Sequence, residues 1–98
     1  MKLNKIEKQY LDKAIIRGGL FLLDADSAIK FIGACQVHNI VILGVDAFLL
    51  FDNKTQPVMD YSIDFTSNNY SNSAFNRYND SIILIEKRKD LYFEIITK

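Results

Sequence analysis

The stretch from Asn39 to Phe51 constrains the fold most, because it is apolar at nearly every position and rich in β-branched and aromatic residues. Such a run is typical of a strand that is buried on both faces. Of its two alternating rows, one is apolar throughout and the other carries a single charge, Asp46. At about 3.3 Å per residue, a straight strand of this length would overhang a domain with an expected radius of gyration of about 13 Å. The sequence therefore predicts a central strand with a bend or bulge at Gly44.

Length and composition indicate one globular domain over residues 1–98. With 49% hydrophobic residues, the chain can form a core without disulfide bonds. The only cysteine, Cys35, falls in an apolar helical pattern, so we expect a buried thiol. The longest apolar run is too short to span a bilayer as a helix, and the N-terminus has no signal-peptide core. We expect a cytoplasmic protein that does not bind membranes.

Charge is balanced overall but unevenly distributed. The formal net charge is zero; residues 1–19 carry five Lys or Arg against two acids, and residues 44–80 carry five Asp against Lys54 and Arg77. A neutral total gives no long-range attraction to nucleic acid, and the basic residues form no stripe with the aromatic ones. We therefore expect no nucleic-acid partner.

Two helices are expected before the central strand. A capping box at residues 4–7 begins the first helix, which is predicted over about 5–17 and ends at Gly18-Gly19. Residues 20–23 form either a short strand or a link under the core. The second helix is capped by Asp24 or Asp26 and ends near His38-Asn39. Asn39 can adopt the left-handed conformation there, and a partly charged His38 side chain would interact favourably with the negative end of the helix dipole.

The second half of the chain adds strands and a third helix. Residues 52–57 have the composition of a turn, and residues 58–65 alternate as a strand antiparallel to the central one. Apolar residues spaced three and four apart favour a helix over 73–87, although its β-branched run also permits a hairpin through 88–90. Residues 91–97 indicate a final, central strand. The predicted class is α+β, with helices packed against an antiparallel sheet of at least three strands, in the order α-α-β-β-α-β.

The segment from Thr66 to Ser81 is polar in an unusual way. It contains five Asn, four Ser and two Tyr within sixteen residues. It is either a solvated loop leading into a helix or a protein-binding surface, because Tyr offers rigid contact area and Asn and Ser offer adaptable hydrogen bonds.

Signatures of enzymes are missing from the sequence. It has no Gly-rich phosphate loop, and with one His and one Cys it has no cluster of metal ligands. We therefore expect no catalytic residue, cofactor or metal. Asp46, Asp52, Asp60 and Asp64 lie on or between two neighbouring strands, where two of them could meet. A small Asp-dependent hydrolase therefore remains an alternative.

Several segments resemble small immunity proteins of bacterial polymorphic-toxin and contact-dependent growth inhibition systems. In one branch of these proteins, a helix leads into a strand with the pattern Leu-Gly-x-Asp, a polar segment follows, and a Tyr-Phe-rich strand ends the chain. The resemblance covers residues 25–98. It is carried by the helix with Ala28 and Ile32, by His38-Asn39 leading into Ile42–Asp46, by the turn and acidic second strand, and by Leu91–Ile95.

The resemblance implies a non-enzymatic cytoplasmic protein that binds a cognate toxin domain and blocks its active site. If the toxin is a nuclease with a basic cleft, an acidic surface would steer association and mimic phosphate. The acidic and aromatic residues that we expect to bind the toxin are Asp46, Asp52, Asp60, Tyr61, Asp64, Tyr70, Tyr78 and Asp80.

Two alternatives to this interpretation stay open. Asp46 could instead be a structural residue that bonds a neighbouring backbone amide. The protein could also be a structural or regulatory subunit that self-associates, as a homodimer, through an exposed strand edge.

Overall fold

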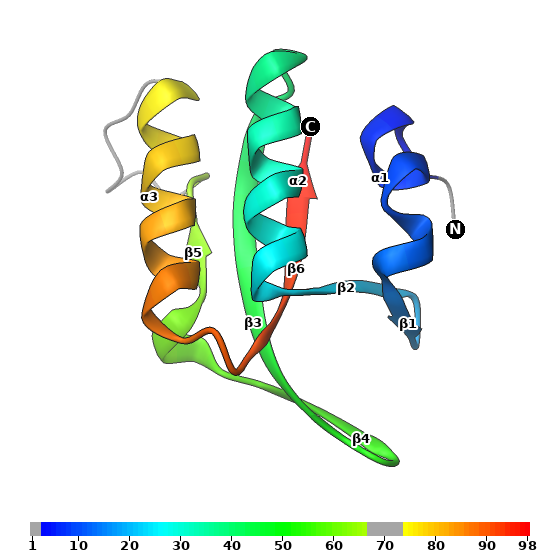
Figure 1. Ribbon diagram of the computed structural model, residues 1–98. Helices are drawn as coiled ribbons and strands as arrows, with labels where there is room; N and C mark the ends of the chain where they lie inside the picture. Colours follow the sequence, from blue (N-terminus) through cyan, green and yellow to red (C-terminus); the bar gives the residue numbers. More distant parts are fainter. Residues whose placement is uncertain (1–2, 67–73) are drawn as a thin grey trace.

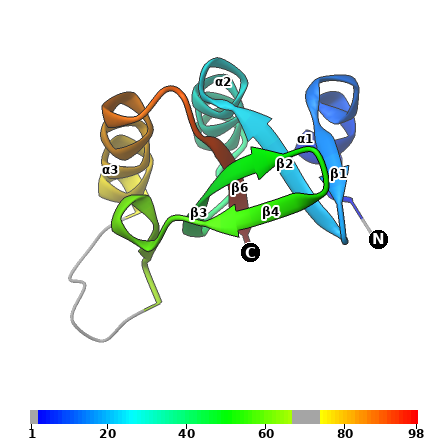
Figure 2. The ribbon, with the colours of Figure 1, turned by 90° about the horizontal axis from the view of Figure 1, so that it is seen from below.

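The computed structural model describes residues 3–66 and 74–98 and has two layers, with the helices on one face of an antiparallel sheet (Figures 1 and 2). This confirms the α+β class. No helix in the described ranges is long and apolar enough to cross a membrane. Within these ranges the order is α1 (Lys5–Gln9), the 3₁₀-helix η1 (Leu11–Lys13), β1 (Ile15–Arg17), β2 (Leu20–Asp24), α2 (Ala25–Val37), β3 (Ile42–Phe51), β4 (Lys54–Pro57), the 3₁₀-helix η2 (Met59–Tyr61), β5 (Ile63–Asp64), α3 (Ala74–Lys87) and β6 (Tyr92–Thr97).

Strand β3 has neighbours along both of its edges. The sheet order is β1-β2-β6-β3-β4, and β5 also pairs with β3, all in antiparallel pairs. β4 pairs with residues 48–51, whereas β5 pairs with residues 44 and 45. The predictions that the stretch from Asn39 contains a central strand and that the last strand is also central are both confirmed.

The N-terminal region differs from the helix predicted over residues 5–17. The α-helix ends at Gln9, and β1 begins six residues later at Ile15. Gly18 and Gly19 have positive φ values of 54° and 82° and form the two-residue turn of the β1–β2 hairpin. Consecutive β-branched residues, Ile15 and Ile16, favour this strand over a helix. The predicted order α-α-β-β-α-β therefore lacked a hairpin between the first two helices, and residues 20–23 are the short strand that was one of two options.

The helix caps follow the local sequence signals. Asn4 and Glu7 form the predicted capping box, with each side chain accepting a hydrogen bond from the backbone N–H of the other residue. Asp24, one of two candidates, caps α2 by accepting from the Ser27 N–H at 2.8 Å. Asn39 has a φ of 56° just beyond α2, as predicted. These ends are set by short-range hydrogen bonds, which explains why sequence patterns locate them.

Gly44 lies at an irregularity in β3. The pairing of β3 with β6 shifts between Ile42 and Gly44, which confirms the predicted bulge. A Cβ atom at position 44 would lie only 2.8 Å from the carbonyl oxygen of Ile63. The absence of a side chain therefore allows β5 to approach β3 closely at this point.

The edge of the sheet beside β3 is more broken than the sequence predicted. The turn spans only residues 52 and 53, since β4 begins at Lys54. The strand predicted over residues 58–65 is interrupted by η2, so that within this range only the two residues of β5 pair with β3. At the interruption, the Ser62 hydroxyl accepts from the Ala47 N–H at 2.9 Å and donates to the Val58 carbonyl at 3.0 Å. A side chain here replaces a backbone partner in the ladder.

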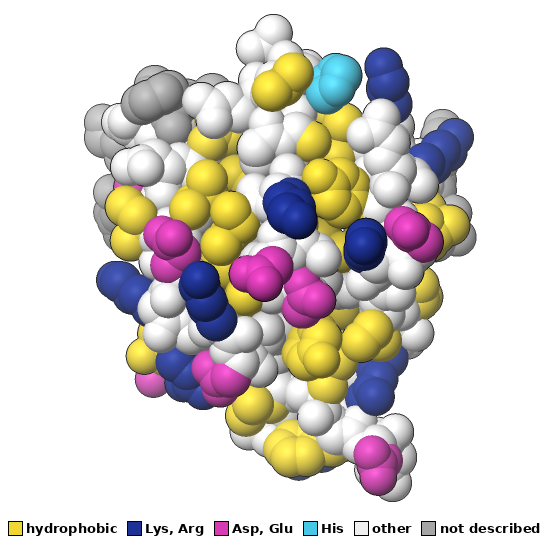
Figure 3. Space-filling model, viewed as in Figure 1, with side chains coloured by type: hydrophobic (Ala, Val, Ile, Leu, Met, Phe, Trp, Pro, Cys, Tyr) yellow, Lys and Arg dark blue, Asp and Glu magenta, His cyan; other side chains and the backbone are white. Residues whose placement is uncertain are grey.

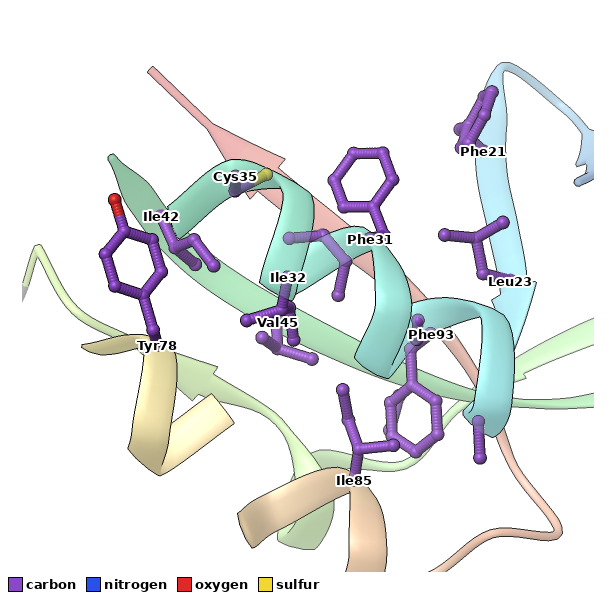
Figure 4. Close-up of a cluster of buried hydrophobic side chains, with 14 of the residues drawn as sticks. Phe21, Leu23, Phe31, Ile32, Cys35, Ile42, Val45, Tyr78, Ile85 and Phe93 are labelled. Carbon is purple, nitrogen blue, oxygen red and sulfur yellow. The ribbon is translucent and has the colours of Figure 1, made fainter. Parts of the chain in front are cut away.

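Helix α3 matches the helix predicted over residues 73–87, so the alternative hairpin is excluded. The core lies between the layers and joins Phe31 and Cys35 of α2, Val45 of β3 and Phe93 of β6 (Figure 4). Burial raises the pKa of the Cys35 thiol to about 12, so it remains protonated at neutral pH. Cys35 is thus the buried thiol that the sequence predicted.

The sheet curls at the end where its two hairpins lie (Figure 2). The Arg17 guanidinium, next to the β1–β2 turn, donates to the carbonyl oxygens of Phe51 and Lys54 beside the β3–β4 turn. Leu22 and Phe48 lie on the face of the sheet turned away from the helices, which we call the outer face, yet both are buried. The curled hairpins therefore close one end of the outer face and leave the other end open.

We predict opposite effects of two Gly-to-Ala substitutions. Gly19→Ala should lower the free energy of unfolding by about 1–2 kcal/mol, because a side chain is strained at positive φ. Gly33→Ala should raise it by about 0.5–1 kcal/mol, because position 33 is helical and a Cβ there meets nothing within 4 Å. Urea denaturation measures both. Equal changes in the two variants would contradict the assignment of Gly18-Gly19 to a hairpin turn.

Candidate functional site

The residues expected to bind a toxin are dispersed over the molecule. Tyr78 is buried in the core, only 6% exposed, and its hydroxyl donates to the Ile40 carbonyl at 2.7 Å (Figure 4). Tyr61 is half-buried under the guanidinium of Arg88. Asp80 is half-buried on α3, and Tyr70 lies outside the described residues. Tyr78 therefore has almost no surface to offer a partner.

Three of the four remaining aspartates are exposed. Asp60 lies on η2, and Asp52 lies in the β3–β4 turn, where it borders a hollow of about 500 Å³ between the hairpin tips. Asp46 and Asp64 come together at another hollow, on the open end of the outer face. Of the residues predicted from sequence, these two are the ones that share a concave surface away from the hairpin tips.

This second hollow, which we call the acidic hollow, has a volume of about 410 Å³. Gly44 forms part of its lining and pairs with Ile96 on one side and Asp64 on the other, so a position without a side chain separates two strands. It is lined by Leu43, Gly44, Asp46, Met59, Ile63, Asp64, Thr66 and Ile96.

The interruption in the sheet edge places Met59 at the acidic hollow. η2 occupies the gap between β4 and β5, where Ser62 takes over the hydrogen bond to β3. Met59 opens this helical turn and remains 76% exposed. An apolar side chain therefore stands at the edge of a site that contains carboxylates.

Asp46 is a half-buried carboxylate for which the described part of the chain provides no bonding partner. Among the described residues, its side chain forms neither a hydrogen bond nor an ion pair. Desolvation by burial raises its pKa above the ordinary value, and the charge of Asp64 raises it further. The alternative in which Asp46 bonds a neighbouring backbone amide is therefore not what the structure shows. The ionised form of the Asp46 carboxylate therefore destabilises the folded state.

Asp64 is held in its ionised form by the opposite kind of environment. Its Oδ1 accepts hydrogen bonds from the Thr66 hydroxyl at 2.6 Å and the Thr66 N–H at 2.8 Å. These bonds lower the pKa of Asp64. At neutral pH a negative charge therefore lies next to the carboxylate of Asp46.

Glu94 is a third carboxylate near Asp46, and it is not among the residues that the sequence predicted to bind a toxin. It lies directly opposite Asp46 in the pairing of β3 with β6. Desolvation raises its pKa, the Phe21 N–H that donates to Oε2 at 2.9 Å lowers it, and the charge of Asp46 raises it again. Glu94 was recognisable as the one charge inside an apolar strand, but its pairing with Asp46 depends on a register that sequence periodicity does not supply.

The arrangement favours a cationic ligand over acid–base catalysis. None of the described residues that line the acidic hollow is Lys, Arg or His, so these residues offer no cationic side chain to an anionic transition state. Within residues 3–66 and 74–98, no group of three or more His, Cys, Asp or Glu is placed to hold a metal ion. Asp46 and Asp64 do have pKa values displaced in opposite directions, which is the feature that an Asp-dependent hydrolase would use.

The face covered by the helices has a different character. Figure 3 shows acidic and basic side chains intermixed there, with apolar surface between them. Charges of both signs at close range largely cancel beyond a Debye length. The acidic hollow is on the opposite side of the sheet, where three carboxylates lie on neighbouring strands.

We predict that neutralising the two aspartates has opposite consequences for stability. Since its pKa is raised, ionised Asp46 destabilises the fold above that pKa, so Asp46→Asn should raise the free energy of unfolding at pH 7. The gain should vanish below the ordinary pKa of 3.8, where both states are protonated. Asp64 has a lowered pKa, so its ionised carboxylate stabilises the fold at pH 7, and this contribution is lost as the pH falls. Asp64→Asn should therefore lower the free energy of unfolding at pH 7. Urea titrations between pH 3 and 7 test this, and a lower stability of Asp46→Asn at pH 7 would contradict it.

Comparisons with known proteins do not assign this chain to a family. No protein-family model matches it, and no curated protein matches its sequence.

Proposed function

We propose that this protein is an immunity protein that binds a cognate bacterial toxin domain, such as a nuclease, in the cytoplasm and blocks its active site. The observation that supports this most is the acidic hollow. It combines an unpartnered, half-buried carboxylate with a side chain, Met59, that is 76% exposed. Both features are unfavourable for an isolated protein and become favourable when a partner covers them.

The location of the hollow suits a surface that binds another protein. The helices cover one face of the sheet and the hairpins close one end of the other, and within residues 3–66 and 74–98 no α-helix lies over the remaining end of the outer face. Asp46, Asp64 and Glu94 are displayed there on strands rather than on a loop, which fixes their spacing. Such a rigid acidic surface would steer and orient a basic cleft.

Self-association is a second candidate, supported by a separate observation. β1 is an edge strand, and its residues Ile15 and Ile16 are 37% and 47% exposed. An exposed, apolar strand edge is a template for pairing with another chain. A second copy paired along β1 would give a homodimer, the basis of the structural or regulatory role.

The immunity proposal is tested by capture from a toxin-producing host, followed by co-expression of the captured protein. We expect one stoichiometric partner, a toxin domain whose growth inhibition this protein abolishes. Met59→Arg should remove protection because it brings bulk and positive charge to the acidic hollow. Val37→Arg is the matched control: Val37 is 77% exposed but lies at the end of α2 in the helical layer. Recovery of this protein alone at all salt concentrations would reject the proposal.

The second candidate is tested by sedimentation equilibrium over a range of concentrations. If β1 mediates pairing, the mass should rise with concentration, and Ile16→Lys should restore the monomer because a charged edge strand resists pairing. Ile83→Lys, on α3 and exposed to 45%, is the control for a lysine added to a different surface. A monomeric mass at every concentration, or the same effect from both variants, would reject pairing through β1.

A further inference from the structure

The acidic hollow has two kinds of surface that one ligand must satisfy together. Leu43, Met59 and Ile96 supply apolar surface, and Asp46 and Asp64 supply negative charge. A hydrated inorganic cation would gain nothing from the apolar walls, whereas a purely apolar group would bury the carboxylates without pairing them. The complementary ligand is a positive charge at the end of an aliphatic chain.

The carboxylates in and beside the hollow repel one another. Asp46 lies directly opposite Glu94 on β6 and shares the hollow with Asp64 of β5. Like charges opposite one another across strands destabilise a sheet. Glu94 is offset in part by the Phe21 N–H, and Asp64 by Thr66 through Oδ1. No described residue compensates Asp46, so a ligand cation placed beside Asp46 would relieve the repulsion.

The size and shape of the hollow agree with a single inserted side chain. Its volume of about 410 Å³ is greater than that of any one side chain. Gly44 lies between Ile96 and Asp64 in the lining, and the space that a side chain there would take is filled by the Ile63 carbonyl of β5, so this part of the wall is closely packed. Met59, exposed at the edge, is flexible enough to fold over an inserted aliphatic stem.

We infer that the acidic hollow is a socket for one Arg or Lys side chain of the partner protein, with the aliphatic stem against Met59 and Ile96 and the cationic group at Asp46 and Asp64. This inference rests on the proposed function, since it names the chemistry by which the toxin domain is recognised. A basic residue in the toxin's substrate cleft would enter the socket and be withdrawn from its substrate.

The socket is tested directly by NMR titration of the whole protein with N-acetyl-arginine amide. Saturable shifts of the Gly44, Asp64 and Thr66 amide signals are expected at concentrations on the order of millimolar. N-acetyl-citrulline amide has nearly the same shape without the charge and should not produce them. Asp46→Asn should weaken arginine binding at least about tenfold. Asp26→Asn removes the same charge at an exposed position on α2, in the helical layer, and should leave binding unchanged.

Three outcomes would overturn the socket. These are equal shifts with the citrulline and arginine probes, equal binding by the wild type and Asp46→Asn, and stronger displacement of the arginine probe by magnesium chloride than by sodium chloride of equal ionic strength. The first outcome is independent of any change in stability caused by a substitution, because the comparison of citrulline with arginine uses the wild-type protein alone.

The socket and the immunity proposal fail in distinguishable ways. If a toxin is captured and neutralised but its affinity is the same for Asp46→Asn and Asp26→Asn, the socket is wrong and the immunity function stands. If the arginine probe binds as expected but no toxin is recovered, the immunity function is wrong and the socket remains as a site for a basic segment of another protein.

Discussion

The close approach of β5 to β3 at Gly44 is the constraint on which much of this structure depends. A Cβ atom at position 44 would lie 2.8 Å from a backbone carbonyl of β5, so any other residue would force the edge of the sheet outward. The same glycine lies at the register shift between β3 and β6 and lines the acidic hollow. One residue thus fixes the bend of the central strand and the position of the edge strand that carries Asp64.

The acidic hollow illustrates how a binding surface conflicts with folding stability. Burial and neighbouring charge make the ionised form of Asp46 unfavourable in the folded protein, and Glu94 opposite it adds to the repulsion. A sequence selected only for stability would have a neutral or apolar side chain at position 46. A polar group that costs stability and has no compensating partner within the described chain is characteristic of sites whose partner is a separate molecule.

Local signals predicted the parts of the fold that local interactions determine. The caps at Asn4 and Asp24, the turn conformation of Asn39 and the helix over 74–87 depend on residues within a few positions, and periodicity identified them. Gly18-Gly19 was misinterpreted because two glycines end a helix and turn a hairpin equally well, and the decision depended on pairing with β2. The break at η2 depends on a Ser62 hydroxyl reaching Ala47, fifteen residues earlier, a contact that no pattern along the chain announces.

The candidate site was predictable to the same extent and for the same reason. Asp46 was conspicuous as the one charge in its strand, but its neighbours Asp64 and Glu94 are brought to it by register across two strand pairs. Tyr78 had the composition of a contact residue and the helical spacing of a core residue, and burial favoured the second.

The two surfaces proposed to bind other chains lie on different parts of the sheet. β1 forms one edge, and the acidic hollow lies beyond β2 and β6, on the far side of β3. Pairing through β1 would therefore leave the hollow open and would place two hollows in one symmetric dimer. Self-association and toxin binding are not alternatives in this geometry, because a dimer would bind two toxin domains without either surface covering the other.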